Sequence, residues 1–254
     1  MDKTAANRVP HIIFIYWVIK IVSTTLGETG ADMFSMTFNL GYGTTIAIFM
    51  SLFLVLLVVK LLLKGYHPLA YWLTFTASAI AGTAMSDFVD RTLRLGYAWG
   101  SAVLVVLLLI VLAIWHKKER SINVECIKIP SIEIFYWVAF LIANTLGTAA
   151  GDFIADNLGL GFEGGAILIT GLLVVIALLH FFTKISGTLL FWLAFVLTRP
   201  FGATFGDFLT KPIARGGINF GTVGSSLFFS VVLIFAIARE TKLEKDRIGA
   251  LPEG

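Results

Sequence analysis

Charged residues are scarce in this sequence: Asp, Glu, Lys and Arg make up 14% of the 254 residues, against about 25% in soluble domains. The single cysteine, Cys126, excludes an internal disulfide and a cysteine-rich metal centre. The sequence also lacks a Walker loop, an HExxH helix and a GxSxG serine. Hydrophobic residues make up 57% of the chain and the mean hydropathy is +0.89. Together these features predict an integral membrane protein with no soluble domain and no cofactor.

Long apolar stretches predict eight membrane-spanning helices. They lie at about residues 10–35, 44–64, 69–94, 98–115, 131–156, 164–183, 186–210 and 221–238. Most lysines and arginines fall on the side of the two chain ends. The other side has only four, which are Arg91, Arg94, Lys211 and Arg215. By the positive-inside rule, both termini are expected in the cytoplasm.

One sequence frame, Trp-x9-Gly-x4-Asp, occurs four times. The tryptophans are Trp17, Trp72, Trp137 and Trp192, the glycines are Gly27, Gly82, Gly147 and Gly202, and the aspartates are Asp32, Asp87, Asp152 and Asp207. The frame predicts four repeats, at 9–64, 65–120, 129–184 and 185–241, within a single transmembrane domain over 1–254. Each repeat consists of an odd-numbered helix, an outer turn and an even-numbered helix. An even number of spans per repeat makes the copies parallel and groups them into halves 1–120 and 128–254.

The outer turn has its own signature. In three copies it ends in leucine, glycine and an aromatic residue, with the glycine nine residues after the aspartate, at Gly41, Gly96 and Gly161. The fourth copy has Gly216 at this spacing and then continues with what resembles a short insertion.

The two helices of a repeat differ in polarity. Even-numbered helices, such as the one over 102–115, are apolar on nearly all sides, as expected for helices that face lipid. Odd-numbered helices carry threonine, asparagine, glycine and charged side chains on one side, so they should face protein or water. We therefore expect four inner and four outer helices.

The motif glycines have a second small residue four positions later, as in Gly27/Ala31 and Gly147/Gly151. This spacing lets helix backbones approach closely within a membrane. Gly27, Gly82, Gly147 and Gly202 are thus predicted to be helix-packing positions.

The aspartates share a helix face with the residues four and seven positions before them. Candidate substrate- or ion-binding residues on this face and beside it are Glu28, Asp32, Asp87, Asp152, Asp207, Thr25, Thr145, Thr148 and Asn144. Carboxylate and hydroxyl oxygens suit hard cations, and a metal would be held by Glu28, Asp32 and Asp152. The alternative is that the four aspartates cap helices or pair with the four basic residues of the outer side.

Three charged residues break the repeat. Lys20 stands where the other copies have phenylalanine, Glu28 where they have threonine or alanine, and Arg199 where they have threonine, alanine or asparagine. Charges at such depth pair with one another or line a wet cavity. One hypothesis is a Glu28–Arg199 ion pair. The other makes Glu28 the ion or proton carrier, with Lys20 and Arg199 tuning its charge.

The segments 16–20 and 24–32 resemble the signature of a bacterial family of multi-pass membrane proteins built from a tandem repeat of unknown function. The resemblance extends through the later Trp, Gly and Asp positions, but the elements with Lys20 and Glu28 are intact only in the first repeat. It implies an inner-membrane protein and no settled activity. The acidic elements are also loosely similar to those of repeat-built cation exchangers, which is an analogy.

The sequence favours a secondary transporter that exports or exchanges a cation, divalent ions included, in a proton-coupled manner. Its expected partners are the lipid bilayer and an ion or small-molecule substrate, with no nucleic acid. The alternatives are a structural or lipid-interacting membrane protein, in which the motif serves only packing, and an intramembrane enzyme that uses the aspartates as a catalytic pair. We do not expect an enzyme, because no residue is positioned to activate a substrate.

Overall fold

The computed structural model describes residues 7–120, 122 and 127–249, and this part of the chain is all-α. Its eight α-helices are α1 (Phe14–Asp32), α2 (Gly41–Leu62), α3 (Pro68–Asp87), α4 (Tyr97–Glu119), α5 (Pro130–Asp152), α6 (Gly161–Phe182), α7 (Gly187–Thr210) and α8 (Thr222–Gly249). The predicted all-α class and the eight helices are confirmed.

Six of the eight, all except α1 and α3, are long and apolar enough to cross a membrane. This is fewer than the eight spans expected. The difference has a physical cause, since α1 carries Lys20, Glu28 and Asp32 within 19 residues and α3 is rich in small and hydroxyl side chains. These polar groups are buried among other helices rather than presented to lipid.

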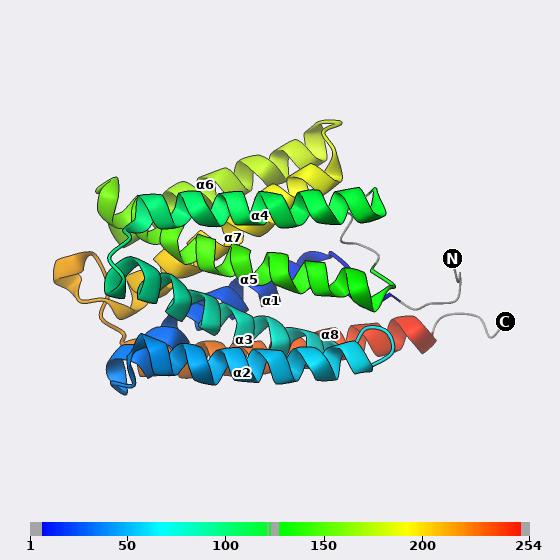
Figure 1. Cartoon of the computed structure of the whole chain (residues 1–254), viewed down its shortest axis with the longest axis horizontal. Helices are drawn as coiled ribbons and strands as arrows, with labels where there is room; N and C mark the ends of the chain where they lie inside the picture. Colours follow the sequence, from blue (N-terminus) through cyan, green and yellow to red (C-terminus); the bar gives the residue numbers. More distant parts are fainter. Residues whose placement is uncertain (1–6, 121, 123–126, 250–254) are drawn as a thin grey trace.

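The odd-numbered helices form an inner ring. α1 packs against α3, α3 against α5, α5 against α7, and α7 against α1. The even-numbered helices lie outside this ring, and their large apolar side chains are mostly exposed. Figure 1 shows the helices running side by side along one long axis, with the start of α1 and the end of α8 at the same end of the bundle.

Each even-numbered helix packs on the odd-numbered helix of the next repeat. The pairs are α2 on α3, α4 on α5, α6 on α7, and α8 on α1, so the last helix closes the circle. α1 and α2 make little direct contact, although a short outer turn joins them. The sequence repeat and the packed helix pair are therefore offset by one helix, which links every repeat to its neighbour.

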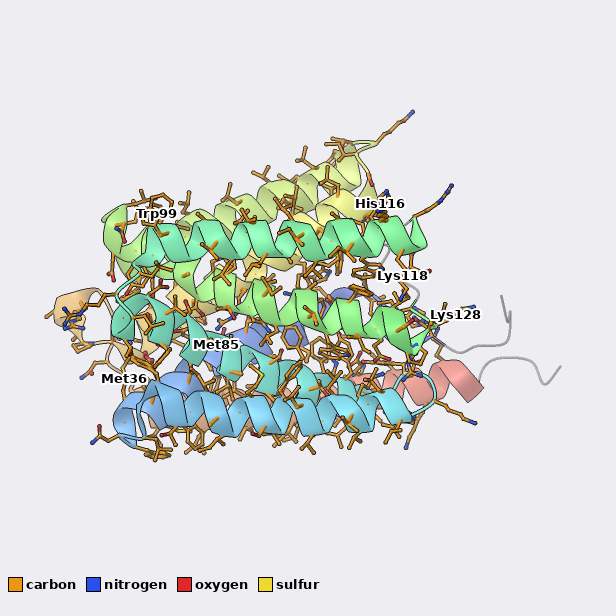
Figure 2. The ribbon with its side chains drawn as sticks, viewed as in Figure 1. Met36, Met85, Trp99, His116, Lys118 and Lys128 are labelled. Carbon is orange, nitrogen blue, oxygen red and sulfur yellow. The ribbon has the colours of Figure 1, made fainter. Side chains whose placement is uncertain are left out.

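The side chains labelled in Figure 2 distinguish the two ends of the bundle. Lys118, Lys128 and His116 lie toward the end where α1 begins and α8 ends, whereas Met36 and Trp99 lie toward the opposite end (Figure 2). We call the first the terminal end and the second the turn end.

At the turn end, all four signature glycines adopt the left-handed conformation. Gly41, Gly96, Gly161 and Gly216 have φ values of 74°, 79°, 66° and 79°, a region that glycine enters without steric cost. Before this turn, three of the inner helices widen. Single π-helical turns, Met33–Thr37, Phe88–Thr92 and Phe153–Asn157, directly follow Asp32, Asp87 and Asp152. In the fourth copy, Lys211 N–H instead bonds to the Asp207 carbonyl in an ordinary α-turn.

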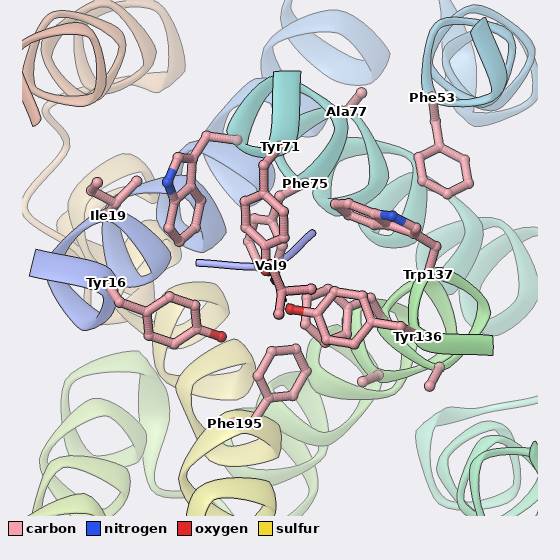
Figure 3. Packing of buried hydrophobic residues seen from close by; sticks show 14 of the residues in the cluster. Val9, Tyr16, Ile19, Phe53, Tyr71, Phe75, Ala77, Tyr136, Trp137 and Phe195 are labelled. Atoms are coloured by element: carbon pink, nitrogen blue, oxygen red, sulfur yellow. Dashed lines mark hydrogen bonds between the residues drawn. The ribbon is translucent and has the colours of Figure 1, made fainter. Parts of the chain in front are cut away.

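At the terminal end, residues 7–13 cross the ring, and we call them the N-terminal strap. Val9 is 1% exposed and lies among the inner aromatic side chains, between Tyr71, Tyr136 and Phe195 (Figure 3). Arg8 is paired with the buried Glu133 of α5. The strap is thus an integral part of the core.

Candidate functional site

The inner face of the ring is built from positions four residues apart. Relative to each motif tryptophan, they are −1, +3, +7, +11 and +15; each step turns the helix by about 40°, so successive positions lie close together on one face. At three of these positions, the four residues (one from each repeat) are named together as a layer of the ring. The aromatic layer is Tyr16, Tyr71, Tyr136 and Phe191, the threonine layer is Glu28, Thr83, Thr148 and Ala203, and the aspartate layer is Asp32, Asp87, Asp152 and Asp207. All are buried.

The motif glycines set the distance between inner helices. Each faces the residue three positions before the glycine of the next repeat, and the four pairs are Gly27–Ala79, Gly82–Asn144, Gly147–Arg199 and Gly202–Thr24. A Cβ at Gly27 would lie 2.7 Å from that of Ala79, and one at Gly202 would lie 2.6 Å from Thr24 Oγ1. Both separations are too short for a side chain, so the ring depends on these glycines.

Gly147→Ala is expected to destabilise the protein by about 1–3 kcal/mol, because the new methyl group would overlap Arg199 within a packed core. Gly171→Ala is the matched control: this α6 position has open space around it, so alanine should be neutral or slightly stabilising. Unfolding in detergent would be compared for both variants. Equal stabilities would show that the ring tolerates a side chain at Gly147.

Glu28 lies at the centre of the threonine layer. Its Oε2 lies 3.4 Å from an Arg199 amino nitrogen and 3.3 Å from the hydroxyls of Thr83 and Thr148. Arg199 also donates to both threonines and, at 3.2 Å, to the Thr24 carbonyl. The Glu28–Arg199 ion pair, one of the two hypotheses, is therefore present, and all four repeats contribute to it.

Lys20 lies two of these four-residue steps nearer the terminal end than Glu28. Its ammonium donates to the Phe195 carbonyl at 2.9 Å and to the Thr198 hydroxyl, and it lies 3.6 Å from the centre of the Phe195 ring. Within the described residues no carboxylate pairs with Lys20. A cation–π contact and polar groups of α7, which contains Pro200, hold it.

The aspartate layer is organised in two pairs. Arg91 bridges Asp87 at 3.2 Å and Asp152 at 3.1 Å. Lys211 bridges Asp32 at 2.6 Å and Asp207 at 3.2 Å. Both cations come four residues after an aspartate, whereas the first and third repeats have Met36 and Asp156 there. All four repeats supply an aspartate, but only the second and fourth supply a cation. The charged groups therefore form two similar sets, each of one cation and two aspartates.

Lys211 lies just beyond the end of α7. Burial lowers its pKa, but the carboxylates of Asp207 and Asp32 raise it more, so the pKa is above its ordinary value and the amine stays charged. A cavity of about 630 Å³ opens beside it at the turn end. Lys211, Arg91, Arg215 and Asp156 line this cavity together with apolar groups.

Three carboxylates lie close enough to share an ion. One oxygen each from Glu28, Asp32 and Asp207 lies within 4.8 Å of the others, and all three side chains are buried. We call this group the acidic cluster. Asp32 Oδ1 accepts no hydrogen bond from the described part of the chain, and Asp207 Oδ1 has only its ion pair with Lys211 at 3.2 Å. The cluster joins the first and fourth repeats, on helices that pack together.

The cluster differs from the expected ligand set. Asp152 pairs with Arg91 and is replaced by Asp207. The hydroxyls of Thr25 and Thr145 bond to their own helix carbonyls, of Ile21 and Leu141. Asn144 instead donates to Ser78 at 3.0 Å, on the contact between α3 and α5. Of the third-repeat candidates, only Thr148 reaches Glu28.

Sequence reasoning missed a second charged group, at the terminal end. Glu133 is fully buried and accepts from Arg8 and, at 2.9 Å, from Lys60. Arg8 also donates to the Lys60 and Leu61 carbonyls at 3.2 and 2.8 Å. The available signal was a glutamate within the apolar first half of this helix.

Comparison with known proteins places the chain in a family. A model described as "Repeat of Unknown Function (DUF347)" matches four times, at residues 15–66, 70–121, 135–186 and 190–246. The chain belongs to the DUF347 repeat family. The resemblance to a tandem-repeat family, and its four copies, is confirmed. No curated protein and no solved structure matches the chain.

Proposed function

We propose that this DUF347 repeat protein is a secondary transporter that exchanges a cation, divalent ions included, for protons through the acidic cluster, and that it is not an enzyme. The observation that supports this proposal is that buried carboxylates outnumber the cations paired with them. Glu28 and the four aspartates give five carboxylates, whereas three cations pair with them, Arg91, Arg199 and Lys211.

Two carboxylates are thus in excess of the paired cations, and one remains in excess when the buried Lys20, which pairs with no carboxylate of the described residues, is counted. An uncompensated ionised carboxylate is very unfavourable in a low-dielectric interior. Protons or a bound cation would supply the missing positive charge. Alternation between the two is what cation–proton exchange requires. Glu28, Asp32 and Asp207 are the oxygen ligands that we assign to the cation, since hard cations prefer carboxylates.

Access to the cluster supports the same function. At the turn end, the cavity is lined by Lys211, which itself contacts two of the cluster aspartates. At the terminal end, the N-terminal strap and the aromatic layer fill the ring axis (Figure 3). A cavity beside the site at one end and filled space at the other would suit one half of an alternating-access cycle. Rocking of residues 1–120 against 128–254 would supply the other half.

All eight helices cross the bilayer in this proposal. α1 and α3 are enclosed by helices of membrane-spanning length, so their polar groups need not meet lipid. We place the protein in a bacterial inner membrane. The terminal end, with its basic residues, would be cytoplasmic and the cavity would face outward.

Proteoliposomes with an internal pH dye test this function. An inward Mn²⁺ gradient should drive proton efflux through the wild-type protein. Glu28→Gln and Asp32→Asn should reduce that flux at least tenfold. Glu163→Gln is the control, because Glu163 is an exposed carboxylate at the turn end. Unchanged flux in the Glu28 and Asp32 variants would refute the role of the acidic cluster. No Mn²⁺-driven proton flux through the wild type, with only stability lost in the variants, would refute transport and favour the structural alternative.

A further inference from the structure

Two cations occupy equivalent places in the aspartate layer, but they are held differently. The guanidinium of Arg91 contacts Asp87 and Asp152 through separate nitrogens, and it also donates to Tyr97 and Tyr42 at 3.2 and 3.4 Å. A planar group fixed from several sides has one stable position.

Lys211 has a single nitrogen on a flexible chain. Among the described residues its charged atom contacts only Asp32 and Asp207. Its side chain is 14% exposed and lines the cavity. A four-carbon stem allows the ammonium to leave the two carboxylates and enter the cavity while the backbone stays in place.

The position of this ammonium coincides with the cation site. Asp32 and Asp207 are two of the three members of the acidic cluster, and the Lys211 nitrogen lies within 3.2 Å of an oxygen of each. Arg91 contacts no member of the cluster. Lys211 therefore occupies the place where a small hard cation would be bound.

We propose that the Lys211 ammonium is a tethered competitor for the transported cation. The inference rests on the proposed function. The arriving cation displaces the ammonium from Asp32 and Asp207, and Lys211 extends into the cavity. When the cation leaves, the ammonium returns, so these two carboxylates always have a cationic partner. A substrate with oxygen-preferring chemistry, such as a divalent metal ion, fits this role.

The competition has a measurable consequence. If the ammonium holds the site in more than about nine-tenths of the molecules, it weakens the apparent affinity for the cation about tenfold. Lys211→Met removes the competitor and keeps the length of the side chain. Lys211→Arg should keep the site blocked, because a guanidinium also bridges the corresponding aspartates at Arg91.

Mn²⁺ binding to purified protein, measured from the loss of the free-ion paramagnetic resonance signal, tests the inference. We expect Lys211→Met to bind Mn²⁺ at least tenfold more tightly than the wild type, and Lys211→Arg no more tightly. Arg215→Met is the control, since Arg215 lines the same cavity and makes no ion pair within the described residues. A similar gain in Arg215→Met would indicate a general field effect and overturn the proposal.

Two outcomes distinguish a failure of this inference from a failure of the proposed transport function. Equal Mn²⁺ affinity in the wild type and Lys211→Met refutes the role of Lys211 and leaves the cation site standing. No Mn²⁺ binding in any variant refutes both. A second measurement uses unaltered protein: acylation of Lys211, followed by mass spectrometry, should become faster when Mn²⁺ is added. A rate that Mn²⁺ leaves unchanged or lowers would overturn the proposal even if the variants failed to fold.

Discussion

Arg199→Met is expected to lower the free energy of unfolding by about 3–5 kcal/mol, because it leaves the buried Glu28 without its cation. The hydroxyls of Thr83 and Thr148 would still face Glu28, but they supply hydrogen bonds and no charge. Arg199 is itself 1% exposed, so no water reaches the pair to screen it. The loss should exceed that of any single substitution on the outer helices.

The double variant Glu28→Gln/Arg199→Met distinguishes the ion pair from simple packing. Removal of both charges avoids an unpaired buried ion, so the double variant should recover most of the stability lost in Arg199→Met. Lys184→Met is the control, because Lys184 is an exposed residue between α6 and α7. Equilibrium unfolding in mixed detergent micelles would measure all three. A double variant no more stable than Arg199→Met would show that Arg199 acts through its packing against Gly147.

The sequence raised this pair as one of two hypotheses for a clear physical reason. Four copies of one frame make any departure conspicuous, and Glu28 and Arg199 are departures one turn apart in depth on different helices. The inner and outer helices could also be predicted, since side-chain polarity reports the environment of a membrane helix. Gly41, Gly96 and Gly161 likewise marked the outer turns before their left-handed conformation was seen.

Other features depend on three-dimensional relations that no local pattern carries. The packing of α2 on α3, rather than on α1, follows from how the ring closes through α8. Asp207 belongs to the acidic cluster and Asp152 does not. This difference follows the ion pairs, since Asp207 pairs with Lys211 and Asp152 pairs with Arg91. The π-helical turn after Asp32 has no residue signature, although such turns are frequent at functional sites. These contacts link distant segments, so they require the folded ring.

Glu133→Gln is expected to release the N-terminal strap. Glu133 is the only carboxylate paired with Arg8 and Lys60 in the described structure, and all three groups are buried. The amide would leave two cations without a counter-charge, at a cost of about 3–5 kcal/mol. Arg8 would move toward water more easily than Lys60, because it lies on a short segment outside the helices. Val9 should then leave the aromatic layer with it.

Labelling of a cysteine at position 9 reads out this movement. In a Val9→Cys/Cys126→Ser background, a water-soluble maleimide should react slowly, since Val9 is 1% exposed. Glu133→Gln should raise the rate at least tenfold. The matched control is Glu119→Gln, which changes an exposed glutamate at the end of α4. If Glu133→Gln lowers stability without faster labelling, the strap is held by Val9 and its aromatic neighbours, and the buried charges serve α2 and α5 alone. Faster labelling would show that Glu133 controls entry to the ring from the terminal end, opposite the cavity that Lys211 lines.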